Sequence, residues 1–99
     1  MISDVVNSFA ERMQSKLDKN IDKRGWEHCS DAYLLDRVLE EFHELKQAVV
    51  TGNVEEIKNE AADLANFAMM VFDNAGKEKM SRREAMVHNF KILYEGGDE

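Results

Sequence analysis

The stretch EAADLANFAMMVF, Glu60 to Phe72, combines an almost continuous apolar run with two carboxylates one helical turn apart. From Ala61 onward its apolar residues surround the helix axis, a pattern typical of a helix that is buried on several sides. An unpaired carboxylate is costly to bury, so Glu60 and Asp63 need a partner. The stretch therefore predicts a central helix whose acidic residues do more than meet solvent.

Turn and cap signals on both sides of this stretch divide the whole chain into helices. The sequence has no proline and no sustained β-branched alternation, which argues against strands. Ser30 and Asn53 are good N-caps, Gly52 and Gly76 are helix stops, and SRRE at 81–84 is a capping box. We expect a single all-α domain over residues 1–99, an antiparallel bundle of about four helices at 3–21, 31–52, 54–76 and 81–95.

Apolar stripes at helical spacing predict which faces of the first two helices pack inward. The stripes comprise Val6, Phe9, Met13 and Leu17, then Leu35, Val38, Phe42, Leu45 and Val49. A chain of 99 residues builds only a modest core, and three neighbouring helices do not cover a helix that is apolar all round. We therefore expect a homo-oligomer, a dimer or tetramer, built on the third helix.

The charge balance limits the partners of the chain. Thirteen basic and 20 acidic residues give a net charge of -7 and a pI near 4.9, so duplex nucleic acid is not an expected partner. The apolar run after Ala61 is shorter than the ~20 residues of a membrane helix, and Asp4 and Glu11 argue against a secretory signal. Cys29 is the only cysteine, so no internal disulfide forms, and the cytoplasm is the expected compartment.

Two acidic pairs share the same spacing, Glu41 with Glu44 and Glu60 with Asp63. Residues three apart lie about 60° apart around a helix, so each pair shares a face. If the two helices pack antiparallel, the four carboxylates converge, and their repulsion calls for protons or a cation. A solvated face is an alternative, stronger for Glu41 and Glu44 than for the other pair. Oxygen ligands favour a hard divalent ion, Mg²⁺ first and Mn²⁺ as its substitute.

The segments RVLEEFHELKQAV (37–49) and EIKNEAADLANFAMMVFDNAG (56–76) resemble the MazG-like all-α nucleoside triphosphate pyrophosphohydrolases. That family carries ExxE, a gap of variable length, and ExxD; here fifteen residues separate Glu44 from Glu60. KNIDKRGW (19–26) is similar to the Lys-Asn and Lys-Gly-Trp elements of small phage and cassette-type members. The resemblance extends over about residues 16–91.

The resemblance implies hydrolysis of a nucleoside triphosphate, often a deoxynucleotide, to the monophosphate and pyrophosphate, for control of nucleotide pools. It makes Glu41, Glu44, Glu60 and Asp63 both metal ligands and catalytic residues, but it does not decide which of them is the base. Glu40 is a further candidate, which would act beside the ligands without binding the metal. The implied substrate contacts are Asn20, Lys23, Trp26, Asn66, Asn89 and Lys91.

Several of these contacts have a structural alternative. Trp26 would also be expected in this loop if its indole only covered the core. Asn66 would also be expected if its side chain were buried and hydrogen-bonded to the backbone. The lysine that many relatives place one turn before Asn89 is Ala85 here, so Lys79, Arg82, Arg83 or Lys91 would replace it.

Two alternative functions remain to be weighed. Glu40-x-x-His43 has the spacing of di-iron bundles, but those need the pattern on two helices, and Asp63 stands where the second histidine belongs. The alternative from another class is a non-catalytic helical module that binds nucleotide or protein without turnover.

Overall fold

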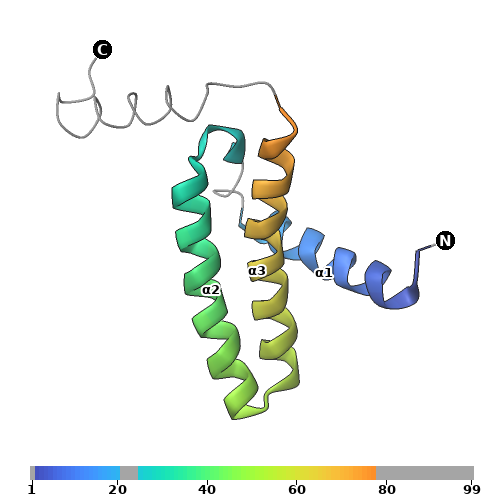
Figure 1. Cartoon of the computed structure of the whole chain (residues 1–99). Helices are drawn as coiled ribbons and strands as arrows, with labels where there is room; N and C mark the ends of the chain where they lie inside the picture. Colours follow the sequence, from blue (N-terminus) through green and yellow to red (C-terminus); the bar gives the residue numbers. More distant parts are fainter. Residues whose placement is uncertain (1, 21–24, 78–99) are drawn as a thin grey trace.

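The computed structural model describes residues 2–20 and 25–77, which form three α-helices and one short 3-10 helix (Figure 1). The helices are α1 (Asp4–Lys19), α2 (Asp31–Thr51) and α3 (Val54–Ala75), and the 3-10 turn is η2 (Trp26–His28). These described segments contain no strand, which confirms the all-α class. The fourth helix expected at 81–95 lies outside the described residues, so three helices stand where about four were predicted.

Caps fix the two long helices at the predicted ends. The Ser30 hydroxyl accepts the Tyr33 amide at 3.1 Å at the start of α2, and the Asn53 side chain accepts the Glu56 amide at 3.0 Å at the start of α3. Between them Gly52 adopts a positive φ of 80°, a conformation that only glycine reaches without strain. This two-residue connection folds α3 back beside α2 as an antiparallel pair (Figure 1).

The core lies where α2 begins and α3 ends. Leu34, Phe67 and Met70 are buried there, and Leu17 of α1 and Trp26 of η2 pack against them. The Trp26 indole donates to Asp73 Oδ2 at 3.0 Å, and Asn74 Nδ2 donates to the Trp26 carbonyl at 3.0 Å. Trp26 therefore covers this end of the core, and its polar edge is anchored to α3.

The apolar stripe predicted to bury α2 is largely exposed. Leu35 and Val49 are 56% and 57% exposed, whereas α2 buries Leu34, Glu41 and Ala48. Neighbouring residues lie about 100° apart around a helix, so α2 has two adjacent apolar faces, and α3 covers one of them. The apolar stripe of α1 was also predicted to pack inward, but no residue of α1 is buried.

Polar contacts hold α1 across α3. Asn66 is fully buried and its Nδ2 donates to the Met13 carbonyl at 3.1 Å, while Arg12 Nη1 donates to Asn59 Oδ1 at 3.1 Å and pairs with Glu55 at 2.9 Å. The N-terminal half of α1 projects away from the pair (Figure 1). A cavity of about 450 Å³ opens between this half and α3, lined by Val5, Phe9, Ile57 and Ala61 among others.

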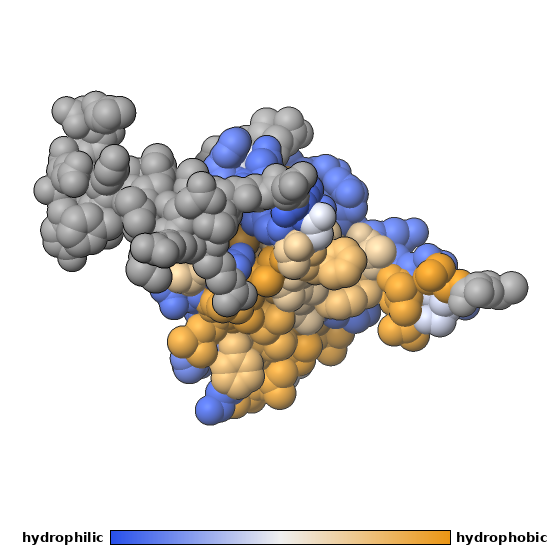
Figure 2. All heavy atoms as spheres, turned by 45° about the horizontal axis from the view of Figure 1, so that its top comes forward, coloured by the Kyte–Doolittle hydropathy of each residue, from blue (hydrophilic) through white to orange (hydrophobic). Residues whose placement is uncertain are grey.

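Apolar side chains cover much of the face shown in Figure 2. Among the described residues, the large apolar side chains that are exposed include Leu35, Leu39, Phe42 and Val49 of α2 and Phe72 of α3, which is 80% exposed. Met70, by contrast, is 1% exposed inside the core. Among the described residues, no helix is long and apolar enough to cross a membrane.

Candidate metal centre

The heptad spacing of α2 turns Glu41 toward α3. Glu41 lies seven residues after Leu34 and seven before Ala48, and residues seven apart return to nearly the same face of a helix. That face packs on α3, so Glu41 is only 5% exposed. On α3, Glu60 and Asp63 share the face that meets Glu41. A solvated role for Glu41 is therefore excluded.

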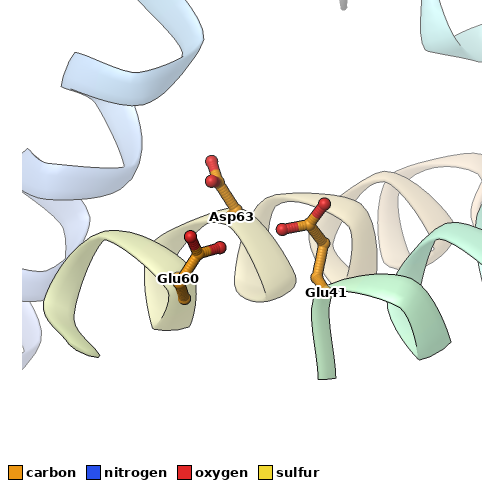
Figure 3. Close-up of side chains that lie close together, drawn as sticks. All are labelled: Glu41, Glu60 and Asp63. Atoms are coloured by element: carbon orange, nitrogen blue, oxygen red, sulfur yellow. The ribbon is translucent and has the colours of Figure 1, made fainter. Parts of the chain in front are cut away.

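The three carboxyl groups meet between the two helices (Figure 3). Each of Glu41, Glu60 and Asp63 offers one oxygen, and these oxygens all lie within 4.8 Å of one another. Glu41 Oε1 and Glu60 Oε1 are buried and accept no hydrogen bond from any N–H or hydroxyl group of the described residues. Buried oxygens of this kind normally have a partner, so the arrangement is complete only with a proton or a cation.

The crowding changes the acidity of both glutamates. Burial, followed by the charges of Glu44, Glu41 and Asp63, raises the pKa of Glu60 to about 7. Burial and the charges of Glu44 and Asp63 also raise the pKa of Glu41, against the opposing effect of Arg37. A hydrogen bond from the protonated Glu60 carboxyl to Glu41 stabilises the state in which Glu60 keeps its proton.

Glu44 lies at the edge of this group. It is exposed and is not among the three residues whose oxygens converge. Its charge nevertheless raises the pKa of both Glu41 and Glu60, as expected of a carboxylate one helical turn after Glu41 on the same face of α2. The structure thus brings together three of the four predicted ligands and leaves the fourth beside them.

Two cations that the sequence reasoning missed flank the carboxylates. Lys16 Nζ of α1 lies 3.4 Å from Asp63 Oδ2, and Arg37 Nη2 lies 3.3 Å from Glu41 Oε2. Arg37 precedes Glu41 by four residues, so this pair was readable from its i, i+4 spacing. The contact of Lys16 with Asp63 joins α1 to α3, and the spacing of residues within one helix does not predict how these two helices pack.

The donor set fits a hard divalent cation. It consists of carboxylate groups from two helices, without sulfur or imidazole, and two of these groups, Glu41 and Glu60, each have a buried oxygen that no N–H of the described residues reaches. Mg²⁺ and Mn²⁺ are the ions that such a set prefers. Which ion binds, and through which oxygens, stays a prediction.

The predicted substrate residues fall into three groups. Asn20 and Trp26 line one cavity of about 210 Å³, together with Gln14, Leu17 and Asp18. Asn66 binds the backbone of α1, and its Oδ1 is buried without a donor among the described residues. The rest, Lys23, Asn89 and Lys91, lie outside the described residues, as do Lys79, Arg82, Arg83 and Ala85. Contact with substrate stays a prediction for all six residues, Asn20, Lys23, Trp26, Asn66, Asn89 and Lys91.

Comparisons with known proteins identify the family. A family model described as phosphoribosyl-ATP pyrophosphohydrolase (PRA-PH) matches residues 5–82, which include both acidic pairs. An uncharacterized protein of Archaeoglobus fulgidus is 32% identical over 73 residues, or 69% of this chain and 78% of that protein. No solved structure matches the chain. PRA-PH proteins are relatives of the MazG-like enzymes, and the family implies a nucleotide pyrophosphohydrolase. Because the matched segment spans most of its length, the chain belongs to the phosphoribosyl-ATP pyrophosphohydrolase family.

Proposed function

We propose that the protein is a Mg²⁺-dependent pyrophosphohydrolase that cleaves (deoxy)nucleoside triphosphates between the α and β phosphates and so controls nucleotide pools. The observation that carries the proposal is the convergence of Glu41, Glu60 and Asp63, whose oxygens lie within 4.8 Å of one another. Glu41 Oε1 and Glu60 Oε1, which belong to two of these side chains, are buried without an N–H donor among the described residues, as expected of oxygens that bind a cation. Family membership supports the same bond specificity.

The chemistry needs charge neutralisation, an activated water and a proton acceptor. A bound Mg²⁺ would supply the first two, since it neutralises the phosphates and lowers the pKa of a bound water. Glu41, Glu60 and Asp63 would hold it, with Glu44 beside them. The water oxygen forms a bond to phosphorus as the α–β P–O bond breaks, and pyrophosphate leaves with that bond's electron pair. The proton of the water passes to a carboxylate group of the protein that is not bound to the metal.

Phosphoribosyl-ATP is the second candidate substrate, because the family model carries that name. It shares the triphosphate with ordinary nucleotides and differs on the base side. We propose that the cavity lined by Asn20 and Trp26 senses this difference, since its residues Gln14 and Leu17 flank Lys16, the partner of Asp63, in the sequence. Both substrates use the same acidic centre.

The proposal also includes a second copy of the chain. The exposed α2 face, defined here as Leu35, Leu39, Phe42 and Val49, is the surface that we propose a homo-oligomer covers. The sequence predicted a contact built on the third helix, but Met70 of that helix is 1% exposed inside the core, so we propose the α2 face as the contact surface.

Pyrophosphate release tests the enzymatic proposal. The panel comprises the common ribo- and deoxyribonucleoside triphosphates and phosphoribosyl-ATP, each with Mg²⁺, with Mn²⁺ and with a chelator. We expect metal-dependent release from at least one substrate and a loss of about 100-fold or more in Glu60→Gln and Asp63→Asn, since even outer partners of metal ligands are worth about 10–100-fold. A matched control is Glu55→Gln, an exposed glutamate of α3 that pairs with Arg12. If the protein binds a nucleotide but releases pyrophosphate from none of these substrates, it is instead a regulatory module.

A further inference from the structure

We propose that Arg37 is a positioning residue, which holds one oxygen of Glu41 so that the other is presented to the metal. This inference rests on the proposed function, because it concerns how the same centre binds its cation. It assigns a role to a residue that the acidic motif does not contain.

The two oxygens of Glu41 have different surroundings. Oε2 lies 3.3 Å from Arg37 Nη2. Oε1 is buried and accepts no hydrogen bond from any N–H or hydroxyl group of the described residues. The Glu41 carboxyl group as a whole lies beside those of Glu60 and Asp63. A carboxylate held at one oxygen cannot rotate freely about its last bond. Arg37 thereby fixes the direction in which Glu41 offers its remaining oxygen.

The guanidinium of Arg37 is itself held on three sides. Its Nη1 pairs with Glu40, its Nη2 pairs with Glu41, and its Cζ lies 4.8 Å from the centre of the Phe67 ring. A planar guanidinium can stack on a ring and donate along its edge at the same time, which a lysine ammonium cannot do. Phe67 belongs to the buried core, so the contact with its ring anchors Arg37, and through Arg37 the Glu41 side chain, to the core.

An arginine beside a cation site has two opposite effects on metal binding. Its positive charge repels the metal, whereas its hold on Glu41 favours the metal by removing rotational freedom from a ligand. The two effects separate in Arg37→Lys, which retains the charge and loses the planar fork. If repulsion were its only contribution, this substitution would leave metal affinity unchanged.

The experiment measures Mn²⁺ binding by electron paramagnetic resonance and calorimetry in the wild type, in Arg37→Lys and in the control Arg12→Lys. Arg12 forms a comparable arginine–glutamate pair, at Glu55, which is not part of the acidic centre. We expect about tenfold weaker Mn²⁺ binding and an altered spectrum of the bound ion in Arg37→Lys alone, in line with the usual effect of residues that orient a metal ligand. Glu40→Gln, which removes only the outer anchor, should weaken binding in the same direction by less.

Steady-state kinetics give an independent readout. We expect Arg37→Lys to lower kcat at limiting Mg²⁺ and to recover in part when Mg²⁺ is raised. Unchanged Mn²⁺ affinity and spectrum in Arg37→Lys, or a higher KM for nucleotide with unchanged Mn²⁺ binding, would overturn the positioning role and leave the proposed function standing. Absence of Mn²⁺ binding in the wild type would overturn both.

Discussion

Burial, and after it the charges of the neighbouring carboxylates, changes the acidity of Glu60. Its pKa of about 7 lies above the ordinary 4.5, so the folded protein binds this proton more tightly than the unfolded chain does. This difference in proton binding contributes to the free energy of unfolding. The contribution is fully present below about pH 4.5 and is lost as the pH rises through 7. At neutral pH the metal-free centre is therefore partly protonated, and cation binding should release a proton.

The first prediction concerns the pH dependence of metal-free stability. Between about pH 5 and about pH 8 the melting temperature of the wild type should fall more steeply than that of Glu60→Gln, because only the wild type gains a repelling charge in this range. A change of 1 kcal/mol moves the melting temperature of a domain of this size by about 4–8 °C, so scanning calorimetry resolves the difference. Saturating Mg²⁺ should reduce the wild-type slope. Parallel curves for the two proteins would contradict the assigned pKa.

The second prediction concerns Lys16, the ammonium 3.4 Å from Asp63. Unlike Arg37 it contacts no second carboxylate or ring in the described part of the chain, so repulsion of the metal is its main effect. A divalent ion about 6 Å away is repelled by about 1.4 kcal/mol even at the dielectric constant of water, which is about tenfold in affinity. Lys16→Met should therefore bind Mn²⁺ up to about tenfold more tightly, as measured by calorimetry. Weaker binding in this variant would show that Lys16 helps to assemble the centre.

At the scale of helices, local signals predicted the ends of elements better than their faces. Ser30, Gly52 and Asn53 act within one turn, so the bounds of α2 and α3 follow from the sequence to within about a residue. The choice between the Leu34 face and the Leu35 face of α2 depends on what packs against it, and both faces are apolar. The acidic pairs were readable because their spacing is local, whereas Lys16 and the backbone contact of Asn66 depend on how α1 crosses α3.

The third prediction tests how α1 is attached. Asn66 is fully buried and donates to the Met13 carbonyl, and α1 buries no residue of its own. Asn66→Ala removes this bond and leaves a small cavity, so we expect a loss of about 1–3 kcal/mol in the free energy of unfolding. Hydrogen exchange should rise chiefly in the amides of α1, with α2 and α3 less affected. Gln14→Ala, which removes only an exposed bond to Asp18, is the control. Equal exchange in every helix would mean that α1 and the α2–α3 pair unfold together.

For the molecule as a whole, the described helices leave several large apolar side chains exposed. Leu35, Leu39, Phe42 and Val49 on α2 are each about half exposed or more, and the N-terminal half of α1 lines an open cavity. Contiguous apolar surface of this kind usually marks an interface. The exposed α2 face among the described residues is the observation that supports the proposed homo-oligomer.

The fourth prediction separates the interface from the core with two apolar-to-lysine substitutions. Phe42 is 48% exposed on the proposed interface, and Met70 is 1% exposed against Leu34 and Phe67. Phe42→Lys should halve the mass, or reduce it further, in light scattering and keep the helical circular dichroism, because the charge is tolerated once the copies separate. Met70→Lys should instead lose helical signal, since an unpaired charge in the core costs more than about 4 kcal/mol. An unchanged mass for Phe42→Lys would place the contact between copies on another surface, of which the α1–α3 cavity is the next to test.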